Sequence, residues 1–219
     1  MQNHARWLRL VAAFLWMGLA GAVSAQTLGK DFQAVNPPQA SESGSSKVEV
    51  IEFFSYACPH CRSLQPSLHA WLKRKPADVD FRRVPAVFQE SWTPFARLYF
   101  TVEAMGLVEK LHNDIFSAIH DQKTRLQDPK VLSDWIATKG VDQKKFMDTY
   151  NSFSVQSRTQ RATDVTRRYG VPFTPALVID GRYLTGPSMT ATSSAVDYDR
   201  FFKVVDQLIA GSRKKQAPK

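Results

Sequence analysis

A run of β-branched and aromatic residues that leads into the chain's two cysteines limits the folds open to this sequence. Residues 48–54 read Val-Glu-Val-Ile-Glu-Phe-Phe, which is typical of a buried strand in the interior of a sheet. After three intervening residues comes Cys58-Pro59-His60-Cys61. Pro is tolerated in the first turn of a helix, so a helix is expected to begin at this motif. The two cysteines therefore belong at a junction between a central strand and a helix N-terminus.

Hydrophobic periodicity along the rest of the chain predicts the order β-α-β, four or five helices, then α-β-β-α. The predicted strands cover residues 32–35, 48–54, 79–84, 176–179 and 182–185. Pro66 should kink the helix that begins at the cysteines. The helices of the middle part lie between residues 93 and 169, with Thr93 as the first N-cap. A last amphipathic helix is predicted over residues 196–210, and the whole order indicates an α/β protein.

Composition excludes several other protein classes. The 219 residues are 43% hydrophobic, and Gly and Pro together number 22, which excludes collagen-like, low-complexity and disordered chains. Two cysteines are too few for a disulfide scaffold or an iron–sulfur ferredoxin. The net charge of +9 is spread along the chain without interleaved aromatic residues, so a nucleic-acid partner is not expected.

The first 25 residues have the features of a secretory signal peptide. Arg6 and Arg9 precede a mostly apolar run at residues 10–20, and small residues lead to Ala25. Cleavage after Ala25 would leave a mature chain that starts at Gln26 and enters an oxidising compartment, where a disulfide persists. A membrane anchor is the alternative, but the run is shorter than the roughly 20 residues that a spanning helix needs.

The spacing of the cysteines is compatible with several kinds of site. Attachment of c-type haem needs a histidine directly after the second cysteine, where this chain has Arg62. A structural zinc site needs four ligands, and the sequence has no second cysteine pair. A buried, inert pair would still oxidise in an exported protein. The pattern therefore predicts a redox-active dithiol, with a metal-binding protein as a rival interpretation.

Electrostatics at a helix N-terminus predict different roles for the two sulfur atoms. Free backbone N–H groups and the positive end of the helix dipole stabilise an anion, so Cys58 should have a lowered pKa. A nearby His60 would lower that pKa further. Cys61 lies one turn into the helix and should be buried, with a higher pKa. We therefore expect Cys58 to attack and be attacked, and Cys61 to resolve the mixed disulfide.

Glu52 interrupts the apolar strand and has two interpretations. It could be a solvated side chain at a sheet edge, or a buried acid that exchanges the proton of Cys61 through water. A buried carboxylate needs a partner, and Arg82 or Arg83 on the next strand could supply it. The residues alone leave both questions open.

The other histidines give no sign of a second site. His69, His112 and His120 lie in helical patterns and are interpreted as surface or packing residues. No Ser–His pair marks a catalytic triad.

Residues 52–61 read Glu-Phe-Phe-Ser-Tyr-Ala-Cys-Pro-His-Cys and closely resemble the active-site segment of the DsbA family of bacterial periplasmic thiol:disulfide oxidoreductases. The Pro59-His60 pair between the cysteines is a specific feature, since thioredoxins typically have Gly-Pro there. The resemblance covers nearly the whole mature chain and implies a thioredoxin fold with an inserted all-helical domain. The expected parts are a signal peptide at residues 1–25, thioredoxin-like parts at 26–90 and 166–211, a helical insertion at 91–165 and a basic tail at 212–219.

The resemblance also implies a cis-proline that faces the dithiol. Pro172 and Pro175 are the candidates, and Pro175 is preferred because it directly precedes the strand predicted at residues 176–179. Thr174 would then offer backbone groups to an extended substrate segment, a form of β-augmentation. For Glu52, the resemblance favours the buried acid.

By this resemblance, the chain is expected to be a periplasmic enzyme that donates its Cys58–Cys61 disulfide to unfolded, newly exported proteins. A quinone-linked inner-membrane oxidase of the DsbB type would reoxidise it. No metal or organic cofactor is implied, and the protein is expected to be a monomer. The rival functions are a disulfide reductase or isomerase, which would use the same residues, and a chaperone-like binder of exported polypeptides.

Overall fold

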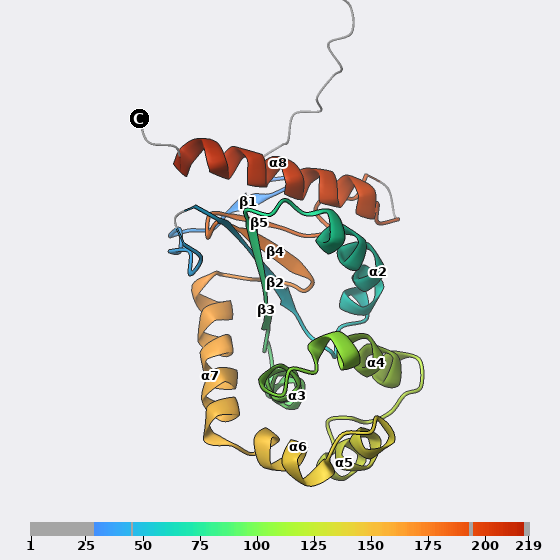
Figure 1. The fold of residues 1–219 in the computed structure, drawn as a ribbon. Coiled ribbons are helices and arrows are strands. Elements are labelled where there is room, and N and C mark those ends of the chain that lie inside the picture. Colours follow the sequence, from blue (N-terminus) through green and yellow to red (C-terminus); the bar gives the residue numbers. More distant parts are fainter. Residues whose placement is uncertain (1–28, 45, 193–194, 217–219) are drawn as a thin grey trace, which may run out of the picture.

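The computed structural model describes residues 29–44, 46–192 and 195–216, so the expected signal peptide at residues 1–25 lies outside the described part. Two helices lie across a five-stranded mixed sheet. Further helices form a separate layer, which is the lower part of the protein as drawn in Figure 1. No helix in the described ranges is both long and apolar enough to cross a membrane.

The sheet has the order β1-β5-β4-β2-β3, in which β2 (Val48–Phe54) lies between two neighbours. It pairs parallel with β3 (Val79–Pro85) and antiparallel with β4 (Ala176–Ile179). β5 (Tyr183–Thr185) connects β4 to β1 (Gln33–Ala34). Every residue of β2 is buried, which explains why most of its positions are apolar on both faces. The five predicted strands are confirmed to within one residue at each end.

α2 (Pro59–Arg74) and α8 (Tyr198–Gln216) pack together against one face of the sheet (Figure 1). The Trp71 indole N–H joins them by donating to Asp206 at 2.8 Å. The predicted end of the last helix at residue 210 is wrong, because α8 continues to residue 216. Arg213 in this extension donates two hydrogen bonds to the Asp78 carboxylate at 2.6 Å, which fixes the additional turns against the body of the protein.

The helical layer contains five helices: α3 (Thr93–Ala104), α4 (Val108–His120), α5 (Pro129–Thr138), α6 (Gln143–Tyr150) and α7 (Phe153–Arg168). Asp128, Asp142 and Ser152 cap α5, α6 and α7 by accepting hydrogen bonds from backbone N–H groups of the first turn. The prediction of Thr93 as an N-cap is wrong. A 3-10 turn, η1 (Glu90–Trp92), runs directly into α3, so Thr93 already has helical backbone angles.

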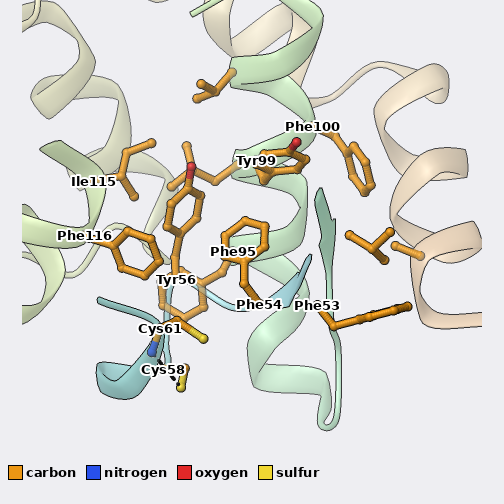
Figure 2. Close-up of a cluster of buried hydrophobic side chains, with 14 of the residues drawn as sticks. Phe53, Phe54, Tyr56, Cys58, Cys61, Phe95, Tyr99, Phe100, Ile115 and Phe116 are labelled. Atoms are coloured by element: carbon orange, nitrogen blue, oxygen red, sulfur yellow. Dashed lines mark hydrogen bonds between the residues drawn. The ribbon is translucent and has the colours of Figure 1, made fainter. Parts of the chain in front are cut away.

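Side chains of β2 enter two hydrophobic cores. Val48 and Val50 pack under α2 and α8, whereas Ile51 and Phe53 face the core shared with the helical layer. This alternation follows from the two-residue period of a strand. The two cysteines belong to the second core, where aromatic side chains of the helical layer surround the start of α2 (Figure 2). The helical layer therefore forms part of the surroundings of the dithiol.

Candidate active site

The two cysteines lie where β2 turns into α2. Cys58 is the N-cap of α2, with extended backbone angles, and Pro59 is the first helical residue. The Cys58 N–H donates to the Ser55 carbonyl at 3.0 Å, which closes the turn between strand and helix. The Cys61 backbone N–H donates to Cys58 Sγ at 3.4 Å, as drawn in Figure 2. The helix start predicted at this motif is confirmed, and a sulfur atom takes the place of the usual capping oxygen.

Both cysteines are free thiols in this structure, and they differ in acidity. The Cys61 thiol, by donating to the Cys58 sulfur, lowers the pKa of Cys58 to about 5 against the opposing effect of burial. Backbone N–H groups of Cys61 and His60 act in the same direction. Burial raises the pKa of Cys61 well above its ordinary value, and the neighbouring Cys58 raises it further. Cys58 is 6% exposed and Cys61 fully buried, so Cys58 is the sulfur that solvent can reach.

His60 acts on Cys58 through its backbone N–H in this structure. Its side chain is exposed and lines a pocket beside the dithiol. The pocket has a volume of about 230 Å³ and is lined by His60, Phe173, Thr174, Pro175, Pro187, Ser188, Val196 and Tyr198. Most of these side chains are apolar, so the pocket suits an apolar segment of another chain.

The loop before β4 brings Thr174 and Pro175 to the dithiol. The Thr174–Pro175 peptide bond is cis, as predicted, and the Val171–Pro172 bond is not. The Cys58 thiol donates to the Thr174 carbonyl oxygen at 3.4 Å, across 116 positions of sequence. A second cis bond, Asn36–Pro37, lies in the polar loop after β1 and was not expected from the sequence.

Glu52 is fully buried, so the interpretation as a solvated edge residue is wrong. Its partner is Arg83, whose Nε lies 2.8 Å from Glu52 Oε2. Arg82 pairs instead with Glu49, at 2.9 Å, because neighbouring residues of β3 point to opposite faces of the sheet. Burial raises the pKa of Glu52, and the Arg83 guanidinium partly offsets this effect.

Gln65 connects the buried acid to the second cysteine, a role that the sequence analysis missed. Its Nε2 donates to Glu52 Oε1 at 3.3 Å and to the Cys61 carbonyl oxygen at 3.1 Å. The available signal was a glutamine four residues after Cys61, on a helix face otherwise filled by Leu64 and Leu68. A buried amide at such a position needs polar partners, and these are supplied by the site.

The described residues contain no group of three or more His, Cys, Asp or Glu side chains that could hold a metal ion. The site therefore consists of an acidic thiol, a buried thiol, a buried acid with its counter-ion, and an adjacent apolar pocket. Such a set supports thiol–disulfide exchange, in which a thiolate is both nucleophile and leaving group.

Comparison with known proteins agrees with this chemistry. The family model of the DSBA-like thioredoxin domain matches residues 49–201. The thiol:disulfide interchange protein DsbA of Burkholderia cepacia is 42% identical over 194 residues, covering 86% of this chain and 92% of that protein. The DsbA of Bordetella parapertussis is 39% identical over 215 residues, covering 98% of this chain and 100% of that protein.

A solved structure shows the same architecture. The crystal structure of Pseudomonas aeruginosa DsbA superposes with a TM-score of 0.80 and 33% sequence identity, covering 87% of this chain and 96% of that one. The sheet, the helical layer and the Cys-Pro-His-Cys start of α2 therefore have one explanation: the chain belongs to the DsbA family, has its thioredoxin fold, and is a thiol:disulfide oxidoreductase.

Proposed function

We propose that this oxidoreductase works as an oxidase that donates a Cys58–Cys61 disulfide to newly exported proteins. The observation that carries the proposal is the position of Cys58 Sγ as the N-cap of α2, where it accepts from the Cys61 N–H at 3.4 Å. At this position the pKa of Cys58 is lowered to about 5, beside a Cys61 whose pKa is raised. A stabilised thiolate favours the reduced enzyme, and a protein whose reduced form is favoured gives its disulfide away readily. A reductase would need the opposite balance.

The first step is attack by a substrate thiolate on Cys58 Sγ of the oxidised enzyme. The Cys58–Cys61 bond breaks, a bond between the substrate sulfur and Cys58 forms, and the electron pair leaves on Cys61. In the second step another substrate thiolate attacks the substrate sulfur of this mixed disulfide, and Cys58 leaves as a thiolate. The substrate loses two electrons, which the enzyme dithiol gains. The low pKa makes Cys58 a good leaving group.

Glu52 is proposed to supply the proton that Cys61 needs when it leaves. A thiol with a raised pKa leaves poorly as an anion, so a nearby acid speeds the step. Burial raises the pKa of Glu52, which keeps a larger protonated fraction available near neutral pH than an exposed Glu would have. The Gln65 amide, which donates to both Glu52 and the Cys61 backbone, supports a short path through water.

Substrates are proposed to bind as extended, unfolded segments beside Cys58. The Thr174 carbonyl oxygen lies 3.4 Å from Cys58 Sγ, where it could accept from a backbone N–H of a substrate strand. The apolar pocket lined by Phe173, Val196 and Tyr198 would hold a substrate side chain with little sequence preference.

The cellular setting is also a proposal. We place the mature protein in the periplasm, after cleavage near Ala25, as a monomer. A quinone-linked inner-membrane oxidase of the DsbB type would reoxidise its dithiol. Within the chain, residues 26–90 and 166–211 would form the thioredoxin-like unit and residues 91–165 the helical insertion. Residues 212–216 of the predicted basic tail belong to the end of α8, where Arg213 contacts Asp78. The mass of the exported protein and its sedimentation would test the cleavage site and the monomer.

Disulfide transfer to a reduced, unfolded protein with two cysteines tests the proposed reaction. Oxidised wild-type protein should form one substrate disulfide per enzyme and end reduced, whereas the Cys58→Ser variant should form none. With a peptide activated as a mixed disulfide, Cys61→Ser should accumulate a peptide–Cys58 adduct and Cys58→Ser should not. Equal disulfide formation by Cys58→Ser would instead favour a chaperone-like role.

A further inference from the structure

α4 holds Tyr56, the second residue before Cys58, by two histidines. His112 Nδ1 lies 2.8 Å from the Tyr56 hydroxyl, at hydrogen-bonding distance. His120 is the last residue of α4, and its Nε2 lies 2.8 Å from the Tyr56 carbonyl oxygen. The side chain and the backbone of one residue are thus both bound by the same helix of the helical layer.

The chemistry of these contacts determines which of the atoms involved carry a hydrogen. A carbonyl oxygen only accepts, so His120 Nε2 carries a hydrogen and donates a hydrogen bond to the Tyr56 carbonyl oxygen. Burial lowers the pKa of His112 well below its ordinary value, and burial raises that of Tyr56, so both groups are neutral near neutral pH. Figure 2 shows Tyr56 beside Phe116 of α4, in the aromatic cluster above the cysteines.

Tyr56 is part of the turn that starts α2. The Cys58 N–H donates to the Ser55 carbonyl at 3.0 Å, and the Ala57 N–H donates to Ser55 Oγ at 3.1 Å. The peptide bond between Tyr56 and Ala57 lies inside this turn. Holding the Tyr56 carbonyl therefore fixes the plane of that peptide, and with it the direction in which the first turn of α2 and its N–H groups point.

His112 also reaches the surroundings of the buried acid. It lines a cavity of about 200 Å³ together with Gln65 and Arg83, the two residues that contact Glu52. Its Nε2 is buried and has no hydrogen-bond partner among the described residues, although the side chain is 5% exposed. A buried polar atom next to a polar cavity is suited to bind water there.

We propose that His112 and His120 are positioning residues for the dithiol: they hold the turn at Tyr56 so that the N–H groups of α2 stay directed at the Cys58 sulfur. The helical layer then sets part of the redox balance of the thioredoxin-like unit, rather than only covering it. This inference rests on the proposed role of Cys58 as the reactive thiolate. The histidines touch neither substrate nor sulfur, and they act through Tyr56.

The first experiment measures the Cys58 pKa by thiolate absorbance and the equilibrium constant of the full-length protein with glutathione. His120→Leu removes the donor and should raise the Cys58 pKa by about half a unit, which makes the enzyme roughly threefold less oxidising. His120→Gln keeps an N–H donor at the same reach and should restore the wild-type values. His69→Leu changes an exposed histidine of α2 in the same way and is the matched control, with no expected shift.

The second experiment removes the other contact with the smallest change. Tyr56→Phe deletes one hydroxyl, and His112→Leu deletes its partner. Each should raise the Cys58 pKa, and the double variant should shift it no more than the larger single one, because both remove the same contact. If a histidine variant does not fold, the Tyr56→Phe variant still tests whether the contact with α4 affects the Cys58 pKa.

Two negative outcomes are distinguishable. A wild-type Cys58 pKa near that of a free thiol would refute the proposed role of Cys58 itself. A low wild-type pKa that stays unchanged in His120→Leu and Tyr56→Phe, while thermal stability falls, would refute the positioning role and leave these residues with packing alone.

Discussion

Arg83 Nε lies 2.8 Å from Glu52 Oε2 at directly paired positions of two parallel strands, so a fully buried acid has its counter-ion within the same sheet. Glu52 is 0% exposed at its side chain, and Arg83 is 13% exposed. The register of β2 and β3 decides this pairing, because a shift by one residue would place Arg83 on the other face of the sheet. The ion pair lets the acid remain buried beside the second cysteine.

Arg83→Met is expected to lower the free energy of unfolding by about 3–5 kcal/mol at neutral pH, because a buried carboxylate loses its partner. This loss of unfolding free energy should be smaller at acid pH. The folded-state pKa of Glu52 is raised above the ordinary value of 4.5, so stability falls as pH rises from about 4.5 through the folded pKa. Urea unfolding at neutral pH and near pH 4.5 measures this difference.

Two controls separate the buried pair from a general loss of charge. Arg167→Met breaks an exposed pair with Asp164 and should cost less than about 0.5 kcal/mol. Glu52→Leu combined with Arg83→Met should regain much of the lost stability, because apolar side chains then replace both charges. If Arg83→Met costs no more than Arg167→Met, the ion pair is unimportant for the buried acid.

The reduced protein is expected to lose stability progressively as pH falls from about 9 to about 5. The folded-state pKa of Cys58 is lowered to about 5 from an ordinary value near 9.0, so its thiolate stabilises the folded state above that pH. At neutral pH the contribution should be about 3 kcal/mol. The measurement is the pH dependence of unfolding for reduced wild-type protein relative to Cys58→Ser. A difference that does not change with pH would contradict the lowered pKa.

Thr174→Val is expected to raise the Cys58 pKa by a fraction of a unit and to make the enzyme less oxidising. Cys61 lowers this pKa most, and the Thr174 side chain lowers it to a smaller extent. Valine keeps the shape and the backbone carbonyl but removes the hydroxyl. Thr163→Val in α7 is a matched substitution away from the dithiol and should leave the pKa unchanged. Identical values in both variants would show that the hydroxyl is not involved.

Val196→Asp is expected to weaken substrate binding. Val196 is 40% exposed in the pocket beside Cys58, and burying a half-exposed valine against a substrate contributes on the order of 1 kcal/mol. The KM for an unfolded substrate should therefore rise about fivefold, with kcat nearly unchanged. Phe153→Asp, at an 84% exposed apolar residue in the helical layer, is the control. An equal rise in both variants would argue against the pocket.

The fold was predictable where local chemistry decides it. Most residues of β2 are β-branched or aromatic, so its limits were predicted from the local sequence. Asp128 and Asp142 cap their helices by accepting backbone hydrogen bonds from residues two or three positions later, which is a local pattern that sequence can reveal. Thr93 and the end of α8 were predicted wrongly, because a preceding 3-10 turn and the distant Asp78 determine them. Contacts between residues far apart in sequence are not visible in local periodicity.

The functional site was also predictable only where a local motif identifies its residues. The cysteines and the cis-proline loop followed from a motif and its resemblance to a family. Arg83 could not be chosen over Arg82 because only the strand register separates them. Gln65 was missed as a site residue, since a polar side chain on a helix looks like any surface residue until its partners are known.

Because Cys58 Sγ caps α2, the start of this helix differs between the oxidised and the reduced enzyme. In the oxidised enzyme that sulfur is bonded to Cys61 and carries no charge, so the exposed peptide groups at the end of the helix face a neutral atom. Each disulfide handed over returns an anion to that place and completes the cap. The position at which this helix begins therefore favours electron flow from the substrate to the enzyme, together with the hydrogen bond from the Cys61 thiol.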